Sequence, residues 1–266
     1  MKNSILAVIN QKGGVGKTTT VINLASALSI LGQKNLVIDL DPQGNASTGL
    51  GKSNNDEKKN VYNLLIKKIK LEDVIQQTQI EGLDLISSNV NLSGLEVETA
   101  SDANRAFVLK EIIVAEENGL LAKYDNIFID CPPSLSLLTI MALVTSRELL
   151  VPLQTEFFAL EGISQLVKTI DRIKVNLNPG LIIRGILLTM FDKRNKLSTQ
   201  VDKEARDYFK GKVYQTVIPR NVRLSEAPSH GLPCVVYDKS CLGSKSYFQL
   251  AKEFINQKNK EVDSAA

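Results

Sequence analysis

The sequence predicts an α/β fold with a doubly wound, mostly parallel β-sheet flanked by helices, and three observations support this prediction. Short aliphatic runs recur along the chain of 266 residues, and most are continuously apolar, as in strands that are covered on both faces. Segments with helical spacing separate these runs, as in right-handed β–α–β units. No linker-like or repeated segment divides the chain, so we expect one domain over residues 1–256 and a flexible tail over residues 257–266.

The predicted elements alternate along the chain. The strands cover residues 5–9, 36–40, 83–86, 127–129, 149–153, 182–188 and 213–218. The helices cover residues 18–31, 104–121, 160–177, 199–209 and 246–255. In the first helix Val21, Leu24 and Leu28 lie on one stripe, and Gly32 directly after it is a good C-terminal stop.

The composition argues against several classes of protein. No segment approaches the roughly 18 consecutive apolar residues of a membrane span, and the first apolar run is too short for a signal peptide. We therefore expect a cytoplasmic protein. A net charge of +3 is not strongly basic, so DNA binding would need a local patch. The three cysteines, Cys131, Cys234 and Cys241, show no C-x-x-C spacing, which favours free thiols over a disulfide or a zinc site.

A glycine-rich segment between the first strand and the first helix has the context of a phosphate-binding loop. The residues that we expect to bind nucleotide phosphates are Lys12, Gly13, Gly14, Val15, Gly16, Lys17, Thr18 and Thr19. The glycines let backbone N–H groups turn toward phosphate oxygens without obstruction by a Cβ atom. Lys17 would supply a positive charge to the phosphates, and the Thr18 hydroxyl can ligate Mg²⁺.

A second lysine makes this loop unusual. Gln11 stands where the ordinary pattern G-x-x-x-x-G-K-[ST] has its first glycine, and Lys12 follows it. Two ammonium groups about 4 Å apart would repel each other by roughly 4 kcal/mol at an effective dielectric constant of about 20. A bound polyphosphate can offset that repulsion, so the two lysines favour an anionic ligand over a glycine-rich turn with solvated lysines.

Three aspartates follow predicted strands close to this loop. Asp39 and Asp41 are two residues apart at the end of a strand, so we expect both to leave the sheet edge on the same face. Asp130 ends another strand, where α/β sheets place Mg²⁺ ligands. One aspartate at such a position is more often a cap or a turn residue, but three beside a phosphate loop favour a functional site.

Together these motifs resemble the ParA/Soj family of chromosome- and plasmid-partitioning ATPases, which belongs to the deviant Walker A group of P-loop NTPases. The resemblance extends over nearly the whole chain. Its motifs are KGGVGKTT at 12–19, DLDPQGNA at 39–46, DCPPS at 130–134, ALEG at 159–162 and VIPRNVRLSEAPSHG at 217–231. The first motif indicates only the wider group, whereas the last two indicate the Soj-like branch.

The resemblance implies a Mg²⁺-dependent ATPase that is weak alone, is stimulated by a partner, and forms a homodimer around ATP. Lys12 would reach the nucleotide of the partner subunit, and Lys17 would hold the phosphates of its own. Asp41 would position the attacking water. The expected metal ligands, direct or through water, are Thr18, Asp39 and Asp130.

The resemblance also implies surfaces outside the phosphate site. Adenine contacts are expected from Met190, Pro219 and Asn221, with ATP and ADP as the nucleotides. Binding to DNA without sequence preference is expected from Arg194 and Arg223. Acidic residues dilute the basic cluster around Arg194, so a solvated helix face stays open as an alternative. The expected partners are a second copy, DNA and a ParB-type centromere-binding protein on the nucleoid, with no membrane.

Three alternatives share parts of this pattern. A MinD-like membrane-associated ATPase that regulates division-site placement would need a basic amphipathic C-terminal helix, and residues 252–266 have few large apolar side chains. An iron–sulfur relative would need paired cysteines at a dimer interface, and only Cys131 is near the predicted site. A nucleotide-binding scaffold would bind ATP without hydrolysis, and substitution of Asp41 would distinguish it.

Overall fold

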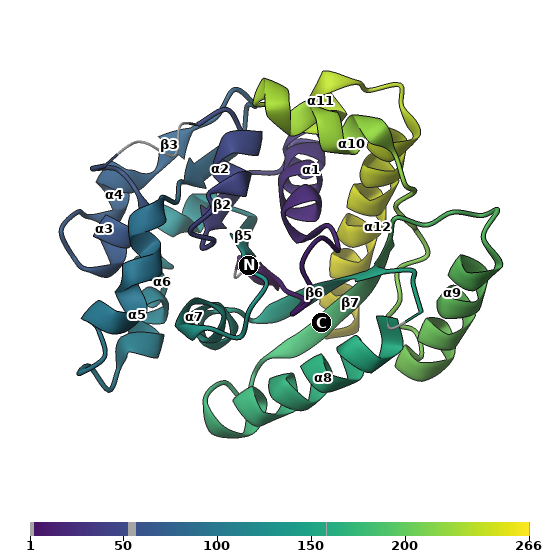
Figure 1. Ribbon diagram of the computed structural model, residues 1–266. Helices are drawn as coiled ribbons and strands as arrows, with labels where there is room; N and C mark the ends of the chain where they lie inside the picture. The colour runs from purple at the N-terminus through teal and green to yellow at the C-terminus, as the bar shows by residue number, and fades with distance from the viewer. Residues whose placement is uncertain (1–2, 53–56, 158, 266) are drawn as a thin grey trace.

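The computed structural model describes residues 3–52, 57–157 and 159–265. Its centre is one seven-stranded sheet in the order β3-β4-β2-β5-β1-β6-β7 (Figure 1). The strands are β1 Ser4–Val8, β2 Asn35–Asp39, β3 Gln76–Gln77, β4 Leu83–Ile86, β5 Asn126–Asp130, β6 Glu148–Gln154 and β7 Ile182–Thr189. All neighbouring strands are parallel except the edge strand β3, which is antiparallel to β4. The predicted fold class is confirmed.

Helices cover both faces of this sheet. The α-helices are α1 Lys17–Ile30, α2 Asn45–Gly49, α3 Val61–Leu65, α4 Leu71–Val74, α5 Leu95–Glu98, α6 Val108–Glu116, α7 Leu137–Thr145, α8 Ala159–Asn176, α9 Lys196–Phe209, α10 Val222–Glu226, α11 Cys234–Tyr237 and α12 Leu242–Ala265. Short 3₁₀ turns are Val90–Gly94, Arg105–Phe107, Leu120–Lys123 and Ala227–His230. Among the described residues, no helix is long and apolar enough to cross a membrane.

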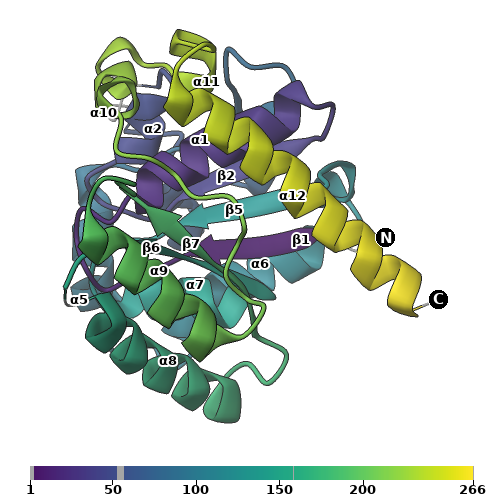
Figure 2. The ribbon, with the colours of Figure 1, turned by 90° about the vertical axis from the view of Figure 1, so that its right-hand side faces the viewer.

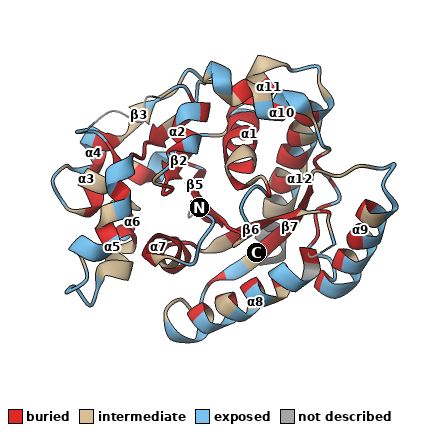
Figure 3. Cartoon of the chain, in the orientation of Figure 1, coloured by how far each residue is buried: buried red, intermediate tan, exposed pale blue. Residues whose placement is uncertain are grey.

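Two apolar cores lie on opposite faces of the sheet. Leu6 and Val8 of β1 pack in the core that includes α1, α11 and α12. Ile5 and Ala7 pack in the core that includes α3, α6, α7, α8 and α9. Successive side chains of a strand point to opposite faces, so a continuously apolar strand supplies both cores. Figure 2 shows the two helical layers, and Figure 3 shows buried residues along the sheet and on the inner sides of the helices.

The prediction of a strand over residues 213–218 was wrong. Within this segment Val213 forms an isolated bridge to β7, but no continuous ladder follows it. The N–H groups of Gln215 and Thr216 instead donate to the carboxylate of Glu253, at 2.7 and 2.9 Å. An acidic side chain of α12 therefore satisfies backbone donors that a strand would give to its neighbour.

Two helices also differ from the predictions. Helix α7 was not predicted, because its residues are apolar on all sides and it is packed between α6 and α8 without an amphipathic stripe. The predicted helix over residues 104–121 contains α6 and two 3₁₀ turns. Helix α12 extends to Ala265, so most of the predicted tail is helical. The flexibility of this tail stays a prediction, and residue 266 lies outside the described residues.

A buried arginine joins the last helix to the sheet. Arg184 of β7 pairs with Glu148 of β6 at 2.9 Å, and its side chain is only 2% exposed. The same guanidinium donates to the Phe254 carbonyl at 3.0 Å and lies 3.9 Å from the centre of the Phe254 ring. Removal of this arginine would leave the Glu148 carboxylate, whose side chain is only 13% exposed, without this cation.

We therefore expect Arg184→Ala to lower the free energy of unfolding by about 3–5 kcal/mol, as for other broken buried ion pairs. Urea unfolding measures this change. The matched control is Arg172→Ala, at an exposed position of α8, which should change stability by about 0.5 kcal/mol at most. Equal effects of the two substitutions would contradict this account of the buried pair.

Candidate functional site

The loop between β1 and α1 borders a cavity of about 390 Å³. Gly14 and Gly16 have positive φ angles of 75° and 89°, which side chains other than glycine rarely allow. No side chain of the described residues caps the start of α1, so its first N–H groups are available to an anion. The predicted site residues that line the cavity are Gly13, Gly14, Gly16, Lys17, Thr18, Thr19, Asp41 and Met190.

The two lysines of the loop have different surroundings. Lys17 is buried beside the cavity, and its Nζ donates to the Lys12 carbonyl at 3.1 Å. Burial lowers the pKa of Lys17, and the charges of Asp130, Cys131 and Asp41 oppose this shift. The Lys12 side chain is 51% exposed and forms an ion pair with Glu156, in the connection after β6. Lys12 is not among the described residues that line the cavity.

Asp130 and Thr18 form the part of the site that fits a hard cation. The Thr18 hydroxyl donates to Asp130 Oδ2 at 2.8 Å. Asp130 Oδ1 is buried and has no hydrogen-bond partner within the described part of the chain. Burial raises the pKa of Asp130 well above its ordinary value, and the charge of Asp39 adds to this. An unpaired buried carboxylate oxygen beside a hydroxyl suits Mg²⁺, which prefers oxygen ligands.

Asp39 and Asp41 are two residues apart but have different surroundings. The fully buried Asp39 carboxylate accepts hydrogen bonds from Asp41 N at 3.1 Å and from Ser47 N and Oγ at 2.8 and 2.7 Å. Burial raises the pKa of Asp39 to about 6, although the hydrogen bonds from Ser47 lower it. By accepting these hydrogen bonds, Asp39 fixes the segment in which Asp41 lies, and Asp41 lines the cavity. Its role as a metal ligand stays a prediction.

Ser47 is a residue of this site that the sequence analysis missed. Its hydroxyl donates to Asp39 and also accepts from Ser88 N at 3.0 Å, next to the end of β4. Nothing in the sequence around a serine of a five-residue helix indicates such a bridge.

Val15, another predicted site residue, connects the phosphate loop to β7. Its carbonyl accepts a hydrogen bond from the Thr189 hydroxyl at 2.9 Å.

The three residues expected near adenine are not all in one place. Met190 lines the cavity beside the glycine loop and has a positive φ of 51°. Pro219 lines a second cavity of about 610 Å³ together with Arg194, and it forms a bridge to Phe191. Asn221 caps α10 by accepting from Arg223 N at 2.9 Å. Adenine contacts by Pro219 and Asn221 stay predictions.

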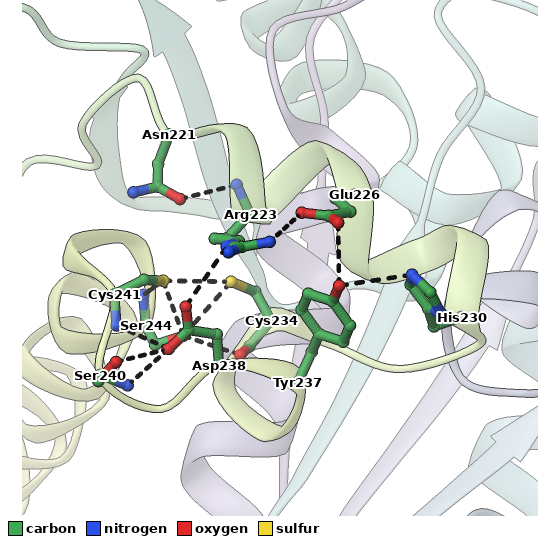
Figure 4. A network of polar contacts seen from close by, with 10 residues as sticks. All are labelled: Asn221, Arg223, Glu226, His230, Cys234, Tyr237, Asp238, Ser240, Cys241 and Ser244. Atoms are coloured by element: carbon green, nitrogen blue, oxygen red, sulfur yellow. Dashed lines mark hydrogen bonds and ion pairs between the residues drawn. The ribbon is translucent and has the colours of Figure 1, made fainter.

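The two arginines expected to bind DNA are both paired with acids. Arg194 has a 91% exposed side chain and contacts Asp192 at 3.0 Å. Arg223 contacts Glu226 at 2.6 Å and Asp238 at 3.5 Å (Figure 4). Both arginines are accessible to a polyanion. To bind a phosphate, each would first have to give up its ion pair with a carboxylate of the same chain.

In P-loop nucleotide hydrolases, the first strand of a parallel sheet leads through a glycine-rich loop into a helix. This chain has that arrangement, and the acidic residues Asp41 and Asp130 at the ends of strands lie close to the loop. A family model described as AAA domain matches residues 3–183. The chromosome partitioning protein ParA of Caulobacter vibrioides (strain NA1000 / CB15N) is 48% identical over 263 residues, which cover 98% of this chain and 97% of that protein. The sporulation initiation inhibitor protein Soj of Bacillus subtilis (strain 168) is 48% identical over 249 residues, covering 94% and 97%. The chain belongs to the ParA/Soj family of chromosome-partitioning ATPases.

Solved structures with the same fold hold nucleotides. The Mycobacterium smegmatis cobyrinic acid a,c-diamide synthase with bound ATP analog and magnesium has a TM-score of 0.82 and 32% identity, covering 94% of this chain and 93% of that one. The septum site-determining protein MinD of Pyrococcus horikoshii, complexed with Mg-ADP, has a TM-score of 0.77 and 27% identity, covering 95% and 96%. The P-loop fold predicted from the sequence is therefore shared with nucleotide-binding proteins.

The bridge by Ser47 predicts a stability effect at the site. Ser47→Ala removes one donor to the buried Asp39 carboxylate and leaves Ser88 N–H without its acceptor, which should cost about 1–3 kcal/mol. Chemical unfolding of the variant measures this cost. Ser101→Ala, at an exposed turn, is the control and should be nearly neutral. Wild-type stability of Ser47→Ala would show that the bridge does not hold the loop.

Proposed function

We propose that this chain is a Mg²⁺-dependent ATPase that forms a homodimer around ATP and binds DNA without sequence preference in that state. In this proposal it segregates chromosomes or plasmids with a ParB-type partner that stimulates hydrolysis, on the nucleoid in the cytoplasm. One observation carries the proposal most directly. Lys17 is buried beside its own phosphate cavity, whereas Lys12 is half-exposed and points away to Glu156.

The nucleotide site supports hydrolysis by position and charge. The N–H groups at the start of α1 and the Lys17 ammonium would hold the phosphates. Thr18 and Asp130 would hold Mg²⁺, which neutralises charge on the phosphates when it is bound. Asp41 lines the same cavity and would orient the attacking water, while Asp39 fixes the Asp41 backbone. Structures of similar proteins with ATP analog or ADP and magnesium support ATP and ADP as the ligands.

The position of Lys12 supports dimerisation. In one subunit the half-exposed lysine is paired with Glu156, and it is not among the described residues that line the cavity. A triphosphate of a second subunit would offer a stronger concentration of negative charge than one carboxylate. ATP binding in two copies would therefore draw Lys12 from Glu156 to the interface, where it stabilises charge during phosphoryl transfer.

Lys12→Ala should affect nucleotide binding less than dimerisation and hydrolysis. We expect ATP affinity to change by roughly threefold at most, hydrolysis to fall by at least about tenfold, and the ATP-dependent dimer to be lost. Titration with a fluorescent nucleotide measures the ATP affinity, and phosphate release measures the hydrolysis rate.

Size-exclusion chromatography measures the dimer in an Asp41→Ala background, in which hydrolysis should be absent and ATP should persist. That background alone should be dimeric with ATP and monomeric with ADP. Lys34→Ala is a control with the same loss of charge at an exposed position. A mass that does not depend on nucleotide, or a Lys12 variant that loses ATP binding first, would overturn this division of roles.

DNA binding is proposed for the surface that carries Arg194 and Arg223. A single subunit offers few phosphate contacts, and a dimer doubles them. Affinity for DNA depends steeply on the number of phosphates that a protein neutralises. Formation of the dimer would therefore raise DNA affinity without any change of fold.

Arg223→Glu should abolish DNA binding at moderate salt and leave ATP binding unchanged. If Arg223 contacts one phosphate in each subunit, a surviving complex should show a slope of log affinity against log salt that is lower by about two. Arg172→Glu makes the same change of charge on α8 and serves as the control. Fluorescence anisotropy with duplex DNA at several salt concentrations measures the affinity and the salt dependence of each variant. Unchanged affinity of Arg223→Glu would show that this surface does not bind DNA.

A further inference from the structure

Two cysteines that the nucleotide site does not use lie against each other. Cys234 begins α11, and Cys241 directly precedes α12. Their sulfur atoms are 3.4 Å apart, and both are free thiols (Figure 4). The spacing of seven residues gave no sign of this pair in the sequence. The turn between the two helices brings the thiols together.

The two sulfur atoms are in van der Waals contact. A disulfide has an S–S length of about 2.05 Å, so the sulfurs would have to approach by about 1.4 Å. Cys234 is fully buried, whereas Cys241 is partly exposed in the turn. Burial raises the pKa of the Cys234 thiol to about 12, so Cys241 is the thiol that meets an external oxidant first.

The turn between the cysteines contains an acid that faces the proposed DNA surface. Asp238 Oδ1 accepts hydrogen bonds from Ser240 N at 3.0 Å and from Cys241 N at 3.1 Å. Asp238 Oδ2 lies 3.5 Å from Arg223 Nε. The backbone of Cys241 is thus one hydrogen bond from the carboxylate that pairs with Arg223, as Figure 4 shows.

We propose that Cys234 and Cys241 are a thiol modification site, which closes to a reversible disulfide and thereby lowers the affinity of the protein for DNA. The effect on DNA rests on the proposed function of Arg223. A disulfide joins both ends of the segment 234–241, which holds α11 and the turn after it, and removes freedom from Asp238. Asp238 is then held against Arg223, and the exchange of this carboxylate for a DNA phosphate becomes less favourable.

The chemistry requires a low-molecular-weight disulfide as the oxidant. The Cys241 thiolate attacks one sulfur of the oxidant, a mixed disulfide forms, and one thiolate leaves. Cys234 loses its proton and attacks the Cys241 sulfur, and the second thiolate leaves. Two protein thiols and one disulfide become one protein disulfide and two small thiols, so two electrons pass from the cysteines to the oxidant. A small thiol in excess reverses the reaction.

The first measurement is the bond itself. The folded protein is equilibrated with graded mixtures of reduced and oxidised glutathione, the remaining thiols are alkylated, and the protein is digested with trypsin. Cleavage after Lys239 separates the cysteines into peptides 224–239 and 240–245, so the disulfide appears as a linked pair by mass spectrometry. We expect this pair in the wild type and its loss in Cys241→Ser. Glutathione adducts without the linked pair at the most oxidising mixture would overturn the proposal.

The second measurement is DNA affinity of the ATP-bound protein before and after oxidation. We expect oxidation to weaken binding by about threefold, as for a surface ion pair that must be broken. Cys241→Ser and Cys234→Ala should show no change on oxidation, and Asp238→Asn should form the disulfide but lose its effect. A linked pair with unchanged DNA affinity would overturn the proposed coupling. If Arg223→Glu binds DNA normally, the proposed role of Arg223 in DNA binding is wrong. The linked peptides would still show whether the disulfide forms.

Discussion

The parallel register of β1, β5 and β2 is the constraint on which the site depends. Val8 of β1 and Asp39 of β2 both lie beside Asp130 of β5. Because these strands end at one level, the phosphate loop, the Asp39 loop and Asp130 all begin at the same sheet edge. A shift of β5 by one residue would turn Asp130 to the other face and separate it from Thr18.

The charged residues proposed to act between molecules all have partners inside the subunit. Lys12 is paired with Glu156, Arg194 with Asp192, and Arg223 with Glu226. Binding of a polyphosphate is then an exchange of anions, in which a carboxylate is released to water as a phosphate arrives. Such exchanges yield modest net affinities for each contact, and they make binding sensitive to salt and to the number of contacts.

The sequence was sufficient for most of the fold because buried parallel strands and the phosphate loop leave local patterns. It was also sufficient to bring Lys17, Thr18 and Asp41 to one cavity, since the glycine loop before α1 and the segment with Asp41 both follow the ends of strands. It was not sufficient where distant residues decide the structure. Glu253 takes the N–H groups of residues 215 and 216 from across the chain, and no pattern around those residues reveals this.

Short-range packing was equally hidden from the sequence. Helix α7 is buried on all sides and therefore lacks the polar face by which a helix is recognised. The bridge by Ser47 joins α2 to Asp39 of β2 and to Ser88 after β4. The contact of Cys234 with Cys241 depends on the turn between α11 and α12. The separation of Met190 from Pro219 also depends on how the chain leaves β7.

The contact of α12 with α1 links the two ends of the chain. Figure 2 shows α12 lying along α1. In this interface the hydroxyls of Thr20 and Tyr247 are 3.2 Å apart and 227 residues apart in sequence. The apolar face of α1 that packs against α12 therefore stays uncovered until the residues of α12 have been synthesised. A nascent chain that contains α1 but not yet α12 exposes apolar surface, and such intermediates are prone to aggregation.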